Sequence, residues 1–527
     1  VAAEMMQGRI TAEQWAPVQG GIEALIAGRT KAELMDAAVA RRLLIAPVLT
    51  VGDVLDSEHL KQREFVQSRP EGRRLGPFAR LAASPLPLRA GVAQSWEAAP
   101  STLSATDAAT DASTGPEPLG FLPQPGQGPL AGLKVLDLFW VVAGPGATRM
   151  LADYGATVVH VESTRRVDMV RNVPPYIEGV MEPERAACHH TTNCNKLNIT
   201  LDLSTTEGRD VLKDLLRWAD VYTESFAPGV VDRMGFGYEV VKALNPEIIM
   251  VSSCLMGQSG PWSPYAGYGN LAAAVSGFHA LTGQPDMPPT GCYGPYTDFT
   301  SVRFNALAIL GALRHRARSG EGQFVDMSQA EAALHFLAPD CLTYLETGQA
   351  PEAQGNRDRL HAPSGVYPVE GFDRWIAISV LDDDQWLSLC ELAGLKDFLE
   401  DGVTGLTQRR AREDDIDERL AEWTAAQEGP ALEDSLQQHG IPAHCVLDTH
   451  DLFHDVQLNH RGHFIGVDHR DFDGAVVESS RLKFSELSPR LPANAPWFGI
   501  DNHRVLRDVL GYDVARIAAL EEANILS

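Results

Sequence analysis

The sequence has few cysteines, and none of them forms a C-x-x-C pair. There are seven in 527 residues, an odd number that cannot all be paired in a disulfide framework. We therefore expect reduced thiols and a cytoplasmic protein. The cluster Cys188-His189-His190…Cys194 is the one candidate metal site, but its spacing fits no common zinc pattern. We expect no metal there, and a polar loop that enters a strand.

Long apolar runs and basic residues are also scarce. No run approaches the ~18 apolar residues of a membrane span, and the opening VAAEMMQGRI has no signal-peptide pattern. The 44 Lys and Arg residues face 70 Asp and Glu residues, a net charge of -26. This charge disfavours binding to nucleic acid or to an anionic membrane surface. A small anionic ligand remains compatible, because a few local cations and helix N-termini suffice to bind it.

A low-complexity segment divides the chain. Residues 96–130 are mostly Ala, Ser, Thr, Pro and Gly, a composition typical of a linker. The stretches VLTVGDVLDSEHLKQREFV and VLDTHDLFHDVQLNHRGHF, which lie on either side of it, resemble each other at an offset of 398 residues. Leu60 matches Leu458 and Arg63 matches Arg461, whereas the closing aromatics Phe65 and Phe464 differ in register by one. We therefore predict that residues 1–95 are the tail of an upstream copy, and that the native polypeptide is longer.

The complete copy begins with an α/β pattern. Strand-like residues 133–140, a glycine-containing helical segment at 144–153 and a second strand at 156–162 follow one another. Such alternation predicts a parallel, doubly wound sheet. We expect a large Rossmann-like domain at 131–330, a connecting helix with a small α/β domain at 331–440, and a return segment at 441–527.

The glycine turn between the first two strands has several interpretations. Glycines let a backbone approach phosphates, and Glu162 could hold a ribose hydroxyl, as in NAD-dependent dehydrogenases. The element reads A-G-P-G-A rather than G-x-G-x-x-G, and Pro145 removes one N–H donor. Tight strand–helix packing without a ligand is the simpler alternative.

Several motifs in a fixed order resemble the family III (CaiB/BaiF) CoA-transferases. They are a strand ending in L-D-L-x-x-V-x-A-G-P, an N-x-N-K element before a second L-D-L, an E-N-F-x-P-G element followed by D-R-M-G, the L-N-P and G-Q-x-G-P elements, an Asp at the start of a helix, and T-G-x-G-Q-x-V-D. These stand here at Leu136–Pro145, Asn193–Leu203, Glu224–Gly235, Leu244–Pro246, Gly257–Pro261, Asp298 and Ser319–Asp326. Ser225 replaces the family's Asn, and Ser319 replaces its Thr.

The resemblance implies the CaiB/BaiF fold, an interlocked dimer and a CoA-transferase that uses an acyl-CoA and a carboxylic acid. It places the catalytic carboxylate at Asp298 and implies that coenzyme A is a substrate, with no metal required. It also carries a set of CoA-binding positions to Val142, Ala143, Leu201, Ser225, Phe226, Ala227, Val230 and Arg233.

Asp298 would act by covalent catalysis. It would form a mixed anhydride with the donor acyl group, then an aspartyl-CoA thioester, with oxyanion donors near Gly294 or Ser364-Gly365. Without the resemblance, an Asp at a helix start would be interpreted as an N-cap. The resemblance implies that Arg233 binds a CoA phosphate, and the alternative is a surface ion pair of Arg233 with Asp232 or Asp220.

Departures from the family pattern leave the substrate open. Val142 stands where a Gln is common in the family. Ser163 stands where the family often has an Arg, and Arg165 and Arg166 lie close enough in sequence to take the place of that Arg. Together with Trp140 and Tyr296, Val142 suggests a pocket more apolar than one for formate or oxalate. The sequence does not identify the donor or the acceptor.

Two other functions are compatible with the same framework of strands and helices. Racemases of acyl-CoA thioesters carry a His-Asp pair in an A-G-H-D element, which here reads Ala266-Gly267-Tyr268-Gly269; a Tyr with a pKa near ~10 cannot replace that pair. The chain could also be one subunit of a heteromeric or tandem transferase, including the CoA-transferase/lyase type. We expect either a homodimer or a pseudo-dimer formed within one chain.

Overall fold

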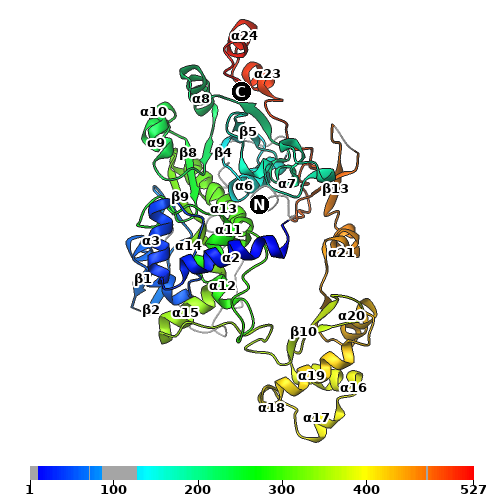
Figure 1. Ribbon diagram of the computed structural model, residues 1–527. Helices are drawn as coiled ribbons and strands as arrows, with labels where there is room; N and C mark the ends of the chain where they lie inside the picture. The colour runs from blue at the N-terminus through cyan, green and yellow to red at the C-terminus, as the bar shows by residue number, and fades with distance from the viewer. Residues whose placement is uncertain (1–9, 71, 86–127, 471–472) are drawn as a thin grey trace, which may run out of the picture. The chain divides into compact units, whose positions relative to one another are not determined.

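The computed structural model describes residues 10–70, 72–85, 128–470 and 473–527. The chain divides into two compact units (Figure 1). The first is formed by the described residues within 1–280, 291–351 and 463–527, and the second by residues 281–290 and 352–462. Of the predicted linker at 96–130, all but 128–130 lies outside the described residues.

The first unit is built on a seven-stranded sheet with the order β3-β9-β8-β7-β4-β5-β6. All neighbouring strands are parallel except β3, which pairs antiparallel with β9. The bounds are β3 Ala79–Leu81, β4 Lys134–Leu138, β5 Thr157–Glu162, β6 Leu197–Thr200, β7 Val221–Glu224, β8 Ile249–Cys254 and β9 Phe324–Ser328. The predicted doubly wound sheet is confirmed.

The order of strands creates a crevice. From β4 the chain moves outward to β5 and β6, then returns to β7 on the opposite side of β4. The direction in which the strand order runs reverses between β4 and β7, so the loops that follow these two strands lead away from each other. Ligands of open α/β sheets bind in the crevice between such loops. The sheet therefore favours a site at the carboxyl ends of β4 and β7.

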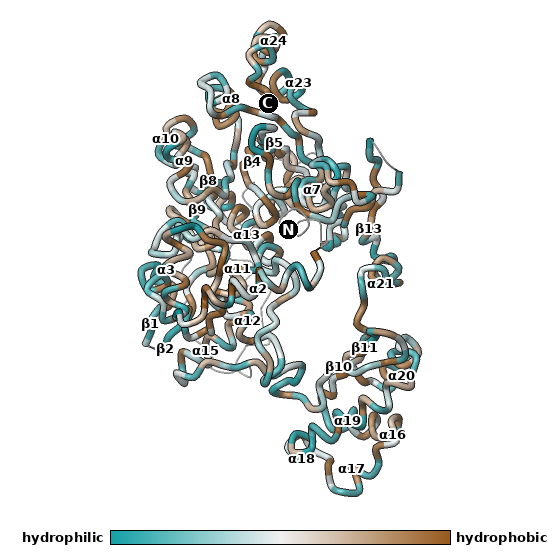
Figure 2. The backbone as a smooth tube through the Cα atoms, viewed as in Figure 1, coloured by the Kyte–Doolittle hydropathy of each residue, from teal (hydrophilic) through white to brown (hydrophobic). Residues whose placement is uncertain are grey.

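Alternate residues of the strands supply two hydrophobic cores, because successive side chains point to opposite faces. Leu136 and Tyr222 pack in the core that includes α8 (Thr206–Trp218). Val135 and Val221 pack on the other face, with residues of α6 (Ala143–Asp153) and α13 (Tyr296–Ser319). Figure 2 shows α11 (Gly269–Val275) as a largely hydrophobic segment beside α13.

Further helices are α7 Ala187–Asn193, α9 Val230–Met234, α10 Tyr238–Leu244, α12 Phe278–Leu281, α14 Gln329–Leu334, α15 Ala338–Thr347, α23 Asn502–Arg504 and α24 Val514–Glu522.

The second unit has its own core. Three antiparallel strands, β10 (Ser364–Pro368), β11 (Trp375–Ser379) and β12 (Ala443–Cys445), form its sheet. Helices pack around the fully buried Trp386. They are α16 Asp383–Ala393, α17 Lys396–Glu400, α18 Leu406–Ala411, α19 Glu413–Thr424 and α20 Gly429–Gln438, and α21 Thr449–His454 and α22 Val456–His460 follow β12.

The internal repeat extends through whole elements. The N-terminal segment contains α2 Ala12–Ile26, α3 Lys31–Arg41, α4 Val51–Leu55, α5 Glu58–Gln62, β1 Val66–Arg69 and β2 Gly72–Leu75. At the same offset of 398, α3 begins where α20 begins, α4 where α21 begins, and α5 coincides with α22. β1 likewise coincides with β13 (Phe464–Val467), which pairs with β14 (Ala475–Glu478). The register therefore continues past the closing aromatic, and Phe65 is equivalent to His463 rather than to Phe464.

The N-terminal segment is part of the first unit. Its strand β3 extends the large sheet beside β9, and Leu49 donates a backbone hydrogen bond to Ala274 of α11. Arg63 is buried, and its guanidinium binds Glu331 of α14 and Asp326 of β9.

Among the described helices, none is both long and apolar enough to cross a membrane. All seven cysteines are free thiols.

Candidate functional site

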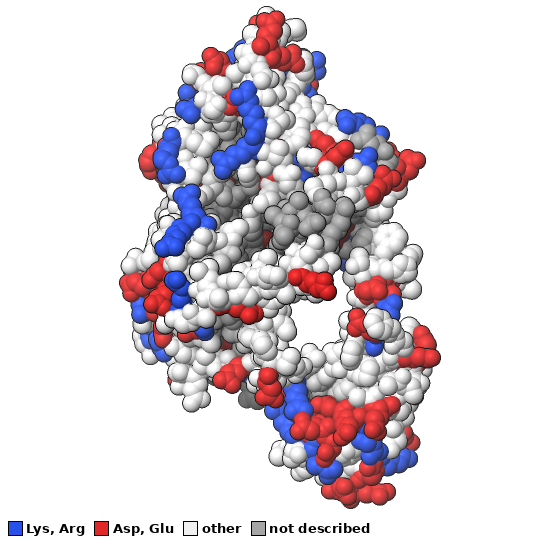
Figure 3. Space-filling model, in the orientation of Figure 1, with Lys and Arg blue, Asp and Glu red and all other residues white. Residues whose placement is uncertain are grey.

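A pocket of about 540 Å³ opens at the predicted crevice. Residues that follow β4, β7 and β8 form part of its wall, and the start of α13 forms another part. Figure 3 shows basic side chains on both sides of a hollow that lies above α3. The lining residues include Arg42, Leu44, Trp140, Val141, Ala143, Arg166, Ser225, Phe226, Ala227, Tyr265, Gly267, Tyr268, Asp298 and Gln329.

Asp298 lies in this pocket but does not cap its helix. It is the third residue of α13, and the N-cap position, Pro295, offers no side-chain cap. The Asp298 carboxylate accepts a hydrogen bond from the Gly269 N–H at 3.1 Å and one from the Gln329 side-chain amide at 2.6 Å. Burial raises the pKa of Asp298, while these two hydrogen bonds act in the opposite direction. The carboxylate is thus held in place by donors on two other elements, which an N-cap would not require.

The backbone at Gly269 fits closely against Asp298. A Cβ at position 269 would lie 2.7 Å from the Asp298 Cγ and 2.6 Å from the Pro295 carbonyl oxygen. Contacts of that length are not tolerated by real side chains, so this backbone requires glycine. The A-G-Y-G element therefore serves as a backbone donor for Asp298, and a racemase-type Asp at its last position would not fit.

The ends of β4 and β7 form one wall. The Trp140 N–H donates to the Ser225 hydroxyl at 2.9 Å, and the Trp140 and Phe226 rings lie 5.7 Å apart, edge to face. The Arg166 guanidinium sits over the Trp140 ring at 5.6 Å. Arg165 instead pairs with Asp202 at 2.7 Å. Of the two arginines considered as replacements after β5, only Arg166 lines the pocket.

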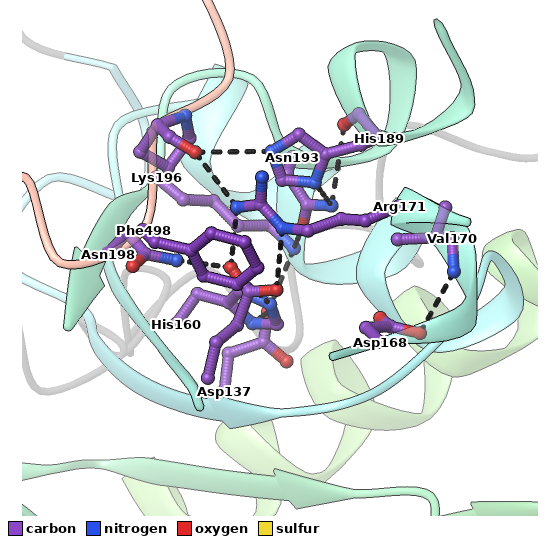
Figure 4. Close-up of polar contacts among 12 residues, drawn as sticks. Asp137, His160, Asp168, Val170, Arg171, His189, Asn193, Lys196, Asn198 and Phe498 are labelled. Carbon is purple, nitrogen blue, oxygen red and sulfur yellow. Dashed lines mark hydrogen bonds and ion pairs between the residues drawn. The ribbon is translucent and has the colours of Figure 1, made fainter. Parts of the chain in front are cut away.

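Val141, which also lines the pocket, has a strained backbone. Its φ is +69°, an outlier for a β-branched residue. The Asp168 carboxylate accepts the Val141 N–H at 3.1 and 3.0 Å and also accepts the Val170 N–H, a contact drawn in Figure 4. Burial raises the pKa of Asp168 to about 6, against the effect of these bonds. The carboxylate fixes the turn between β4 and α6.

Two other motif residues are structural. Lys196, from the N-x-N-K element, pairs with Asp137 of β4 at 2.8 Å and donates to Asn193 at 2.9 Å (Figure 4). Glu162 is buried and binds Arg171 through both carboxylate oxygens, at 2.9 and 2.7 Å. Glu162 is therefore not available to a ribose, which removes the basis of the dehydrogenase alternative.

The predicted CoA-binding residues fall into two groups. Ala143, Ser225, Phe226 and Ala227 line the pocket together with Asp298. The remaining four do not: Val142 is buried as the N-cap of α6, Leu201 lies in the hydrophobic core, and Val230 and Arg233 lie on α9. Asp220, one ion-pair partner considered for Arg233, pairs with Arg316 at 3.1 Å.

Other predicted features also lie elsewhere. Tyr296 packs against Phe278 and is not among the lining residues. Ser364 and Gly365 belong to β10 in the second unit. Within the described chain, only Asp448, His450 and Asp451 bring three potential metal-ligand atoms together. Asp448 and Asp451 already form the capping box of α21.

The sequence reasoning missed the partners of Asp298. Gln329 follows the V-D-M-S element directly, and Gly269 ends the A-G-Y-G element, but nothing in either motif indicated contact with Asp298. Arg42 was also missed, since it precedes the segment in which the repeat is visible in the sequence.

Comparison with known proteins is consistent across sequence and structure. A sequence profile described as CoA-transferase family III matches residues 2–103 and 130–502. The chain is 32% identical to the succinate–glutarate CoA-transferase of Agrobacterium fabrum over 375 residues, covering 69% of this chain and 93% of that protein. It is 29% identical to a probable CoA-transferase of Mycobacterium tuberculosis over 521 residues, covering 94% of this chain and 62% of that protein. The solved structure of a CaiB/BaiF family protein from Brucella suis superimposes with a TM-score of 0.67 at 31% identity, covering 73% of this chain and all of that one.

Proposed function

The chain belongs to CoA-transferase family III, and we propose that it moves CoA from an acyl-CoA donor to a carboxylic acid acceptor through Asp298. The observation that carries the proposal is the position of this carboxylate. It is buried in the pocket at the sheet's crevice, with one hydrogen bond to each of its oxygens. Cytoplasmic location fits the seven free thiols.

The reaction is a series of acyl exchanges without net proton transfer. An Asp298 oxygen attacks the thioester carbon, the C–S bond breaks, and CoA thiolate leaves a mixed anhydride. The thiolate attacks the aspartyl carbonyl and releases the donor carboxylate, which leaves an aspartyl-CoA thioester. The acceptor carboxylate then attacks that thioester and releases thiolate, which takes the acceptor acyl group and regenerates Asp298.

The contacts of Asp298 suit this chemistry. When one oxygen forms the anhydride, the other remains a carbonyl oxygen that keeps one of the two donors. During attack on the aspartyl carbonyl, the same donor faces the developing oxyanion and stabilises it. The Gly269 donor is a backbone N–H, so it needs no reorientation. The wall of Trp140, Ser225 and Phe226 would take the CoA, and Arg166 would meet its phosphates.

Substitution of Asp298 tests the proposal. Asp298→Asn and Asp298→Ala should lower kcat by a factor on the order of 10³ or more, since loss of a nucleophile removes the covalent path. Binding of free CoA, measured by calorimetry, serves as the control and should persist. Turnover near the wild-type rate in either variant would exclude Asp298 as the carrier.

We also propose that the N-terminal segment is a second copy of the module's C-terminal part. The support is the repeat of α3, α4, α5 and β1 at one offset, together with the longer Mycobacterium tuberculosis relative, of which this chain covers 62%. Two modules would then interlock as a pseudo-dimer or through a second chain. The mass of the protein produced by its own host distinguishes these arrangements.

A further inference from the structure

We propose that Arg42, from the N-terminal segment, binds the second carboxylate of a dicarboxylic acid and so selects diacids over monoacids. The inference rests on the proposed CoA transfer at Asp298 and adds its substrate class. The supporting features are the pocket's cations, the anchoring of the Arg42 segment, and the backbone conformation at Arg42.

Two basic residues line the pocket, Arg42 and Arg166, and the one acidic lining residue is Asp298. Arg166 stacks on Trp140, on the wall formed by the ends of β4 and β7. Among the described residues, Arg42 has no ion pair, and its side chain is exposed to the pocket. The two cations therefore line different walls of the pocket. Only Arg166 lies on the wall that we propose binds CoA.

Hydrogen bonds connect the segment that contains Arg42 to the loop that binds Asp298. The Tyr265 hydroxyl donates to the backbone carbonyl of Ile45 at 2.7 Å, which ties the N-terminal segment to the loop before α11. That loop continues through Gly267 and Tyr268, which line the pocket, to Gly269, whose N–H binds Asp298. Ile45, three residues after Arg42, is thus bound to the loop that positions the reacting carboxylate, and Arg42 lines the same pocket as that loop.

The backbone at Arg42 provides independent support. Arg42 follows α3 with a φ of +53°, a left-handed conformation that favours glycine. The equivalent position in the second copy, 398 residues later, is Gly440, with a φ of +75°. The first copy therefore has arginine at a position where its repeat uses glycine. Strain of this kind persists where a side chain has a function.

A diacid needs such a partner. When one carboxylate reacts at Asp298, the other enters the same pocket, and an unpaired carboxylate in a partly desolvated site is costly. A guanidinium forms the charge-assisted, two-pronged hydrogen bonds that a carboxylate accepts best. Leu44 lines the pocket beside Arg42 and offers an apolar surface for the methylene groups between the two carboxylates.

The test compares succinate with butyrate, two four-carbon acids that differ in the second carboxylate. Arg42→Gly, which copies the second repeat and suits the left-handed backbone, should raise the KM for succinate at least tenfold and lower kcat less than threefold. The ratio of kcat/KM for succinate to that for butyrate should fall about tenfold. Arg42→Lys should restore part of the ratio, and Arg41→Ala, which changes the neighbouring arginine outside the pocket, should keep the wild-type ratio.

Each other outcome gives a decision. An equal rise in the KM for the acyl-CoA donor with both acceptors would place Arg42 on CoA and overturn the proposal. A wild-type protein that does not prefer succinate to butyrate would also overturn it. If the wild type transfers CoA to no acid, the proposed function fails, and succinate binding by calorimetry then decides the role of Arg42. Binding by the wild type that Arg42→Gly abolishes supports the role, and no binding by the wild type rejects it.

Discussion

Residues 50–69 and 448–467 form the same helices and strand at one offset, but their surroundings differ. In the first stretch Val54, Leu55 and Leu60 are buried, whereas Leu452 and Phe453, the equivalents of Val54 and Leu55, are exposed. Both stretches begin with a capping box, Thr50 with Asp53 and Asp448 with Asp451. Local signals therefore build the elements in both stretches, and within the described chain only the first stretch buries this face.

The first stretch also reaches the candidate site. Arg63 binds Glu331 and Asp326, which flank Gln329, and Gln329 holds Asp298. The N-terminal segment thus contacts residues on either side of the Asp298 partner Gln329, and its residue Arg42 lines the pocket. The comparison indicates that the same local elements can pack into a core in one stretch and remain exposed in the other.

The largest expected effect is at the buried arginine. Arg63→Ala leaves two buried carboxylates without a partner and should destabilise the protein by about 3–5 kcal/mol. The matched control is Arg461→Ala at the exposed equivalent, where about 0–1 kcal/mol is expected. Denaturant midpoints measure both. Equal losses would mean that the two segments have similar surroundings.

A pair of leucines gives the next contrast. Leu60 is 1% exposed, and Leu60→Ala should cost about 2–5 kcal/mol through lost contacts and a cavity. Leu458 is only half-buried, so Leu458→Ala should cost about 1 kcal/mol. Thermal unfolding of the two variants compares them. A larger loss at Leu458 would reveal that a partner covers the second segment in solution.

The link from the first segment to Asp298 predicts a pH effect. The proposed role of Asp298 requires an ionised carboxylate, so kcat/KM should fall as pH drops through the pKa of Asp298, which burial raises. Gln329→Met removes a hydrogen bond that lowers this pKa, so the acid limb should move to higher pH and the rate should fall by about tenfold, or 1.4 kcal/mol. A pH profile of kcat/KM measures the shift. If the acid limb of the profile does not move, Gln329 does not influence the pKa of Asp298.

The smallest effects should be equal in the two copies. Thr50→Ala and Asp448→Ala each remove an N-cap and should cost about 1 kcal/mol. Amide hydrogen exchange in α4 and α21 measures the local loss. A loss confined to α4 would show that capping matters only in the buried copy.

Sequence patterns predicted the strand–helix–strand unit that forms β4, α6 and β5, and the family resemblance predicted Asp298. The family and fold class are confirmed by the profile match and the solved relative. The partners of Asp298 were not predictable, because Gly269 and Gln329 lie 29 and 31 residues from it. Leu201, which the family motif predicts to bind CoA, follows β6 and lies in the hydrophobic core. Contacts between distant segments depend on the fold, which local patterns do not specify.

Trapping the covalent intermediate shows which residue carries CoA during transfer. The protein is incubated with an acyl-CoA, quenched in acid and digested, and the peptide that contains Asp298 is weighed by mass spectrometry. We expect a CoA thioester on Asp298 in the wild type and none in Asp298→Asn. An adduct on a different residue, or turnover with no adduct on any peptide, would contradict it.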